Sequence, residues 1–191
     1  LERGLNEVLQ ETAPGQKIGD HSAAKGLWFL AQSNYDIRFG PDQELSERII
    51  FPVTSIQRNG LEDVRLTAHR DETGKMIYYA TYTAYDGRNV LSQLFETEDF
   101  RHFKFATLNG SGVQNKGMAL FPRRINGRYA MLSRQDGANI FLMYSDSVHF
   151  WNEASFLLSP AYPWEFIKVG NCGSPIETEA GWLVLSHGVG P

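Results

Sequence analysis

The chain has 191 residues, of which 42% are hydrophobic and 13% aromatic, a composition that predicts a globular domain with a core and excludes a disordered chain. The formal net charge of −4 argues against a nucleic-acid-binding protein, because such proteins carry a strongly basic surface. Cys172 is the single cysteine, which excludes an internal disulfide, and no apolar run approaches the roughly 18 residues of a membrane span, so we expect a cytoplasmic protein without nucleic-acid or membrane partners.

The first residues differ in pattern from the rest of the chain. Apolar residues in segment 1–12 recur at three- and four-residue intervals, which is the spacing of one face of a helix. Pro14 and Gly15 then end the segment. We therefore expect residues 1–25 to form a short helix and linker, and residues 26–191 to form one domain.

From residue 26 onward, short runs rich in β-branched and aromatic residues are separated by Asn-Gly and Asp-Gly dipeptides. This pattern predicts many short strands that are joined by tight turns. Strands do not alternate with helices, so a parallel α/β sheet is not expected. The clearest predicted strands are 76–85, 128–133, 140–144 and 181–186.

An internal repeat is the most informative feature of the sequence. Asn59-Gly60, Asn115-Lys116-Gly117 and Asn171-Cys172-Gly173 recur at intervals of 56 residues, and each precedes a short apolar run. A second run then opens with an aromatic residue, and in the first two units it leads to Asp-Gly. A unit of about 50 residues with about four strands has the size of one β-propeller blade.

The repeat therefore predicts an all-β fold in which about three consecutive blades of a propeller are visible. Propellers need about four to eight blades to close, so we expect this chain to be part of a longer propeller. Unpaired strand edges would favour association with the remaining blades or with other chains, including a homo-oligomer. The alternative fold is a β-sandwich with chance similarity between the units.

Equivalent positions of successive blades converge on the central channel of a propeller. Asp63 and Lys116 stand near the start of the first strands of two units, and Arg134 and His187 stand five residues after the leading aromatics of the second and third units. Arg, Lys and His together suit a phosphate group, because they offer a fork of donors, a point charge and a ring donor. For each cation alone, a solvated surface position is the simpler interpretation.

Asp63 lies within a charged trio, Glu62-Asp63 and Arg65, inside an apolar run. One interpretation is a structural ion pair from Arg65 to one of the acids. The other makes Asp63 a general acid.

Several segments resemble glycoside hydrolase family 130. They are Gly-Leu-Glu-Asp-Val-Arg-Leu at 60–66, Tyr-Thr-Ala-Tyr-Asp-Gly at 82–87, the run 115–134 from Asn-Lys-Gly to Leu-Ser-Arg, and the run 174–189 from Ser-Pro-Ile to His-Gly-Val. The resemblance covers about residues 45–191 with the motifs in the family's order. It implies a five-bladed β-propeller and an inverting phosphorylase of β-mannosides, or one of the related β-mannosidases.

The resemblance also implies roles for individual residues. Asp63 matches the Asp of the family's Glu-Asp-Pro-Arg motif, the general acid, and Lys116, Arg134 and His187 match its phosphate-binding cations. The implied co-substrate is inorganic phosphate, with no other cofactor and no metal, and the partner is a β-mannoside oligosaccharide. Candidate sugar contacts are Asn115, Tyr85 and Trp164, the last because its Tyr-Pro-Trp-Glu segment is typical of a loop.

This sequence departs from the family pattern at two positions. Val64 stands where the family usually has Pro, and Gly117 stands where Asp is common. Both departures leave the proposed charges in place, but they leave the glycan partner open.

Three functions are therefore carried forward from the sequence. The first is phosphorolysis, in which the anionic nucleophile is held by cations and needs one carboxylate. The second is hydrolysis by inversion, which requires a second carboxylate to activate water. The third is a sugar-binding propeller without turnover.

Thiol catalysis by Cys172 with His187 is set aside, because a lone cysteine in a strand-start motif is more often structural. His102 and His149 are interpreted as packing or turn residues.

Overall fold

The structure is a computed structural model that describes residue 27 and residues 30–190. The helix and linker expected at residues 1–25 lie outside the described residues. The regular structure of the described chain consists almost entirely of antiparallel β-strands, which confirms the all-β prediction. In this part of the chain, no helix is long and apolar enough to cross a membrane.

The first sheet has five antiparallel strands in the order β1-β5-β4-β3-β2. Two short 3-10 turns, η1 and η2, connect β1 to β2. The bounds of the elements are β1 Tyr35–Arg38, η1 Leu45–Glu47, η2 Ser55–Gln57, β2 Gly60–Arg70, β3 Met76–Tyr85, β4 Val90–Thr97 and β5 His102–Thr107.

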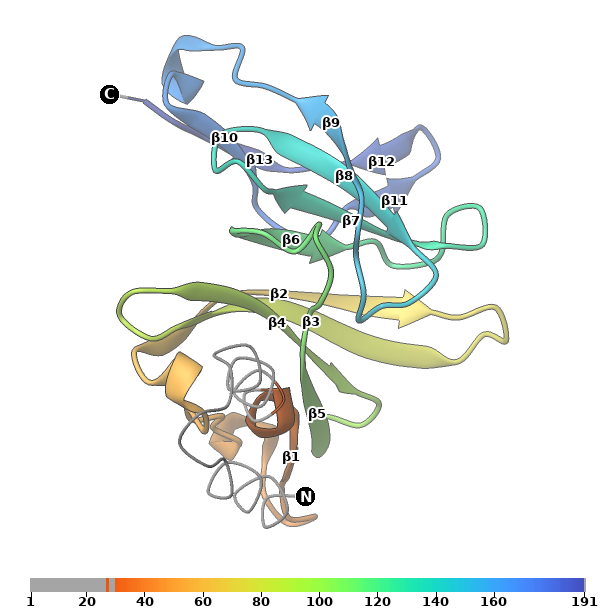
Figure 1. The fold of residues 1–191 in the computed structure, drawn as a ribbon. Coiled ribbons are helices and arrows are strands. Elements are labelled where there is room, and N and C mark those ends of the chain that lie inside the picture. The colour runs from red at the N-terminus through yellow and green to blue at the C-terminus, as the bar shows by residue number, and fades with distance from the viewer. Residues whose placement is uncertain (1–26, 28–29, 191) are drawn as a thin grey trace, which may run out of the picture.

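The second sheet has four strands in the order β6-β7-β8-β9, and two shorter hairpins follow it. One hairpin pairs β10 with β13 and the other pairs β11 with β12. Figure 1 shows the first sheet, the second sheet and the hairpins placed one after another along the molecule. The bounds are β6 Lys116–Leu120, β7 Tyr129–Arg134, β8 Ile140–Ser145, β9 Ala154–Leu158, η3 Pro163–Glu165, β10 Lys168–Asn171, β11 Ile176–Thr178, β12 Gly181–Leu183 and β13 Ser186–Val189.

The Asp-Gly dipeptides of the repeat form the same turn in both sheets. The carboxylate of Asp86 accepts hydrogen bonds from the backbone N–H groups of Arg88 and Asn89 at 2.8 and 2.7 Å. Asp136 accepts equivalent bonds from Ala138 and Asn139 at 2.9 and 2.8 Å. Aspartate favours such turns because its side chain can bond the backbone two residues on. The turn chemistry therefore repeats from one unit to the next, as the sequence predicts.

Three apolar clusters fill the spaces between and beside the sheets. The cluster between the two sheets is built around Trp151, whose side chain is fully buried, together with Leu94 of β4 and Met131 of β7. Neighbouring residues of β7 point to opposite faces of their sheet, so Ala130 and Leu132 belong instead to the cluster that faces the C-terminal hairpins. The remaining cluster covers the other face of the first sheet. Both faces of β7 are therefore buried.

The third unit departs from the expected pattern. Asn171 ends β10 instead of preceding a first strand, and the predicted strand 181–186 is divided between β12 and β13. The two short hairpins continue one another, since Asn171 pairs with Ser186 and Ile176 pairs with Leu183. The third unit is thus one hairpin with an interruption at residues 172–175.

Candidate anion-binding site

A β-bulge interrupts the first hairpin of each of the two sheets. In β2, Glu62 pairs with Thr83 and Arg65 pairs with Thr81, so Asp63 and Val64 stand opposite a single residue of β3. In β6, Lys116 pairs with Arg134 and Ala119 pairs with Leu132, which places Gly117 and Met118 opposite a single residue of β7. Bulges of this kind bend a strand and re-aim its side chains, and they are common beside active sites.

Lys116 and Asp63 meet across the two sheets. The Nζ atom of Lys116 lies 3.3 Å from Oδ2 of Asp63, and both side chains remain partly accessible to solvent. Both sequence-predicted residues therefore share one location, although they are 53 positions apart.

Arg134 and His187 meet over Gly170 of β10. A Cβ atom placed on Gly170 would lie 2.8 Å from Nη1 of Arg134 and 2.6 Å from Cε1 of His187. Both side chains therefore pack directly on the glycine, and any larger residue there would displace one of them. Because Arg134 is the cross-strand partner of Lys116, the Arg134–His187 pair is next to the Lys116–Asp63 pair.

Arg65 is a further cation of this cluster. Its Nη1 donates to the backbone carbonyl of Asp63 at 3.2 Å, and its Nη2 donates to the backbone carbonyl of Asn171 at 3.3 Å. Sequence reasoning interpreted Arg65 as the partner of a carboxylate, whereas these contacts are to backbone oxygens. The signal that could have indicated its place is its spacing of two residues from Asp63 on one strand.

Several buried polar atoms of the cluster have no hydrogen-bond partner among the described residues. They are Nε of Arg65, Nε of Arg134, and both Oδ1 and Nδ2 of Asn171. Arg134 is 7% exposed and Asn171 is 1% exposed. Buried polar groups in native proteins are nearly always satisfied, so unpartnered donors on a buried arginine and a buried asparagine indicate a ligand or ordered water.

The electrostatics of the cluster are dominated by positive charge. Burial lowers the pKa of Arg65, the carboxylate of Asp63 opposes this effect, and Arg134 adds to it. Burial also lowers the pKa of His187, and the neighbouring Arg134, Arg65 and Lys168 lower it further, against a smaller opposite effect of Asp63. Cations that disfavour one another's charge are stabilised by a bound anion.

The candidate sugar contacts occupy different surroundings. Trp164 is 61% exposed, stacks on Tyr162 with ring centroids 4.5 Å apart, and lies against Gly188, the neighbour of His187. The amide of Asn115 lies against Gly137, and Tyr85 ends β3 opposite Gly60. Trp164 thus adjoins the cluster, and all three contacts to sugar stay predictions.

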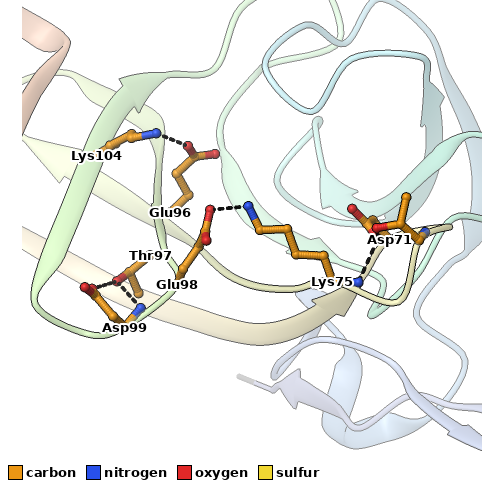
Figure 2. Close-up of polar contacts among 8 residues, drawn as sticks. Asp71, Lys75, Glu96, Thr97, Glu98, Asp99 and Lys104 are labelled. Carbon is orange, nitrogen blue, oxygen red and sulfur yellow. Dashed lines mark hydrogen bonds and ion pairs between the residues drawn. The ribbon is translucent and has the colours of Figure 1, made fainter.

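A second charged region lies on the first sheet, away from its bulge. Figure 2 shows Lys75 bound to Glu98 and Lys104 bound to Glu96, with Nζ–Oε1 distances of 2.6 and 3.4 Å. These acids help to line a surface hollow that does not include the bulge residues. Across the described ranges, no group of three or more His, Cys, Asp or Glu side chains could hold a metal ion.

Successive antiparallel sheets of about four strands are the architecture of consecutive β-propeller blades. The chain belongs to glycoside hydrolase family 130: residues 30–191 match the profile of that family, which is described as β-1,4-mannooligosaccharide phosphorylase. The family and fold that the sequence predicts are thereby confirmed. The number of blades in the complete ring stays a prediction.

Individual relatives give the same assignment. The chain is 30% identical over 184 residues to a β-1,2-mannobiose phosphorylase of Listeria innocua. The aligned stretch covers 90% of this chain and 50% of the relative. It is 30% identical over 187 residues to a 1,2-β-oligomannan phosphorylase of Thermoanaerobacter sp., covering 93% of this chain and 57% of the relative. The chain therefore spans about half the length of these curated relatives.

Two comparisons concern a shorter stretch and a solved structure. A β-1,4-mannooligosaccharide phosphorylase of Ruminococcus albus is 36% identical over 99 residues, which are 49% of this chain and 29% of the relative. The structure of the Listeria innocua β-1,2-mannobiose phosphorylase in complex with β-1,2-mannobiose superimposes with a TM-score of 0.61 at 27% identity, covering 72% of this chain and 39% of that one.

Proposed function

We propose that this chain forms part of a phosphorylase that cleaves β-mannosides with inorganic phosphate and releases α-mannose 1-phosphate. The observation that carries the proposal is the meeting of Lys116, Arg134 and His187 around buried donors that lack partners. Curated relatives along 90% and 93% of the chain are named as phosphorylases of β-1,2-linked mannose. Inorganic phosphate is the proposed co-substrate, and no other cofactor is invoked.

In the proposed reaction, the cations hold the phosphate in place of the general base that water would need. Arg134 offers a planar fork of donors, Lys116 offers a point charge, and His187 offers a ring N–H. Fixing an anionic nucleophile beside the anomeric carbon supplies proximity, and the fixed charges stabilise the transition state. A phosphate oxygen forms the new bond to the anomeric carbon as the bond to the leaving oxygen breaks.

Asp63 is the proposed general acid. Its carboxyl group lies at the edge of the cation cluster, 3.3 Å from Nζ of Lys116, and 46% of its side chain is exposed. Resemblance to the family assigns proton transfer from Asp63 through a sugar hydroxyl to the leaving oxygen. A phosphate that engages Lys116 would take the place of the Asp63 carboxyl group in this ion pair.

The glycan linkage remains part of the proposal, because the named relatives include enzymes of β-1,2- and of β-1,4-linked substrates. We favour β-1,2-linked mannosides, since the relatives with that name match nearly the whole chain.

The direct experiment incubates the whole protein with β-1,2-mannobiose and, separately, β-1,4-mannobiose, each with and without phosphate. Phosphorus NMR identifies α-mannose 1-phosphate, and chromatography measures free mannose. The proposal expects the phosphorylated product only when phosphate is present. Release of mannose alone at the same rate without phosphate would instead indicate the hydrolase. Binding of mannobiose without any product would indicate the sugar-binding propeller.

A further inference from the structure

Strand pairing aligns the two bulges residue by residue. By strand pairing, Asp63 corresponds to Gly117, since each is the first of two residues that face one residue of the partner strand. Both have left-handed backbone angles, with φ of 55° at Asp63 and 87° at Gly117. Glycine adopts this region without steric penalty, whereas other residues do so at a cost of about 1–2 kcal/mol.

The strained residue is the one with the proposed chemical role. Strained backbone persists only where surrounding contacts enforce it, and it concentrates at functional sites. A bulged residue also leaves its backbone groups outside the strand ladder. Something other than β3 must therefore hold the Asp63 backbone in place.

Arg65 supplies the missing contacts. Its Nη1 donates to the carbonyl of Asp63 itself, at 3.2 Å, and its Nη2 reaches the carbonyl of Asn171, at 3.3 Å. One half-buried guanidinium therefore joins the bulge of β2 to the end of β10, 106 residues away. At the corresponding position of the second sheet, opposite Leu132, stands Ala119, which has no side-chain donor, and there the bulge is a glycine.

The strand opposite the bulge is fixed by a different set of contacts. Tyr82, which faces Asp63 and Val64 by strand pairing, is buried, and its hydroxyl donates to Oε1 of Gln93 at 2.9 Å. The buried Gln57 donates to the same hydroxyl at 3.0 Å. Arg65 is therefore not needed to hold β3, and its two contacts act on the bulge and on β10.

We propose that Arg65 is a positioning residue that holds Asp63 in its left-handed bulge and locks this bulge to β10, so that the carboxyl group faces the anion held by Arg134 and His187. The inference rests on the proposed function for the role of Asp63. It adds that the acid and the anion site are aligned by one arginine that contacts both strands.

The test compares the whole wild-type protein with Arg65→Lys and Arg65→Ala. The control is Arg128→Lys, because Arg128 is exposed and its guanidinium lies over the ring of Tyr144, 4.9 Å from the centroid. Each protein is assayed with phosphate on β-mannobiose and on 4-nitrophenyl β-mannoside. The nitrophenolate departs without a proton, so its release does not depend on a correctly placed acid.

For Arg65→Ala we expect kcat on β-mannobiose to fall by about 100-fold, the effect of a displacement of about 1 Å at a reacting group. The fall on the nitrophenyl substrate should be at least tenfold smaller, and guanidinium ion added to Arg65→Ala should restore part of the lost rate. Arg65→Lys should lie between Arg65→Ala and the wild type, and Arg128→Lys should match the wild type. Equal losses on both substrates, or a change confined to the KM for phosphate, would overturn the inference.

Crystal structures of wild type and Arg65→Lys give a readout that does not require turnover. We expect Asp63 in the variant to leave the left-handed region and its carboxylate to move away from Lys116. An unchanged Asp63 would overturn the role of Arg65, whatever the activity. If the wild type shows no phosphate-dependent product, the proposed function fails, and the positioning of Asp63 by Arg65 is decided by this structural comparison.

Discussion

The candidate anion-binding site and the acidic region of the first sheet, which comprises Lys75, Glu96, Glu98 and Lys104, both gather charges, but in the acidic region these charges are largely exposed and paired with one another. In the acidic region, Lys75 and Glu98 are paired at 2.6 Å, and both side chains are more than half exposed (Figure 2). At the candidate anion-binding site, Arg134 of β7 is buried, and its Nε has no partner among the described residues. Exposed and paired charges need no ligand, whereas buried donors without partners do.

The largest effect is expected when a carboxylate of the candidate site is replaced and compared with the same replacement in the acidic region. Asp63→Asn keeps the shape of the side chain but removes the transferable proton, so kcat on β-mannobiose should fall by about 10²–10⁴-fold. The matched control is Glu98→Gln in the acidic region, which should leave kcat unchanged. Steady-state assays of the purified whole proteins measure both. Near-wild-type kcat for Asp63→Asn on this poor leaving group would mean that another residue is the acid.

The next largest effect is expected when the buried cation Arg134 is removed. Arg134→Ala should weaken the use of phosphate by about 1.5–3 kcal/mol, which is the contribution of a hydrogen bond to a charged group. Binding of the sugar should change much less, because the lost contact is to the nucleophile. The measurement is the KM for phosphate against the Kd for mannobiose, with Lys75→Ala as the exposed control. Equal changes in both constants would remove Arg134 from the anion site.

A smaller effect is expected when Gly170, which lies beneath the Arg134 and His187 side chains, is replaced. In Gly170→Ala the added Cβ would meet Arg134 and His187 at 2.6–2.9 Å, so the ends of these two side chains must move. Phosphate should bind about tenfold more weakly, equivalent to one weakened hydrogen bond to a charged group. The melting temperature should change little, because the displaced atoms are the ends of side chains. A KM for phosphate that equals the wild-type value would show that Gly170 does not set the geometry of the site.

The buried His69 leads to a prediction about the pH dependence of folding stability, which can be tested without an activity assay. It is 1% exposed, lies between the rings of Tyr79 and Tyr129, and its Nε2 has no partner among the described residues. Burial, and secondarily Arg124, lowers its pKa below the ordinary value of 6.5. The unfolded chain therefore binds the proton more readily, and stability should decrease as the pH falls below about 6.5.

The measurement is chemical denaturation between pH 8 and pH 5, compared with His69→Phe, which keeps an aromatic ring but cannot titrate. On acidification, the free energy of unfolding should decrease less in the variant, because the variant lacks the contribution that comes from protonation of His69. Identical pH dependence in the two proteins would show that the protonation of His69 is not linked to folding.

Much of the fold could be predicted from the sequence, because its determinants are local. The Asp-Gly turns at Asp86 and Asp136 form where the dipeptides stand, and predicted strand 76–85 is β3. The third unit could not be predicted, since the interruption at residues 172–175 depends on pairing between β10 and β13. Residues 1–25 lie outside the described part of the chain.

The sequence indicates which residues lie near one another in the candidate site, but not their register, and the roles of these residues stay predictions. Counting from the leading aromatics aligns Arg134 with Ala84, whereas strand pairing aligns it with Thr83, because Lys116 corresponds to Glu62. The same pairing aligns Met131 with Ala80, and therefore Tyr129 with Tyr78 and not with Tyr79, so a count that starts from Tyr79 is one residue out of register. The contact of Arg65 with the backbone oxygen of Asn171 could not be predicted either, because the two residues are 106 positions apart in the sequence.

We infer that buried polar atoms without partners at Arg134 and Asn171, and not the exposed ion pairs of Lys75 and Lys104, mark the anion site. A crystal structure of the whole protein with millimolar phosphate tests it most directly. We expect one phosphate among Lys116, Arg134 and His187, with charge-assisted contacts of about 2.7–2.9 Å, and none beside Lys75 or Lys104. A phosphate seated only at those exposed lysines, or an empty site between the bulges at saturating phosphate, would contradict the account.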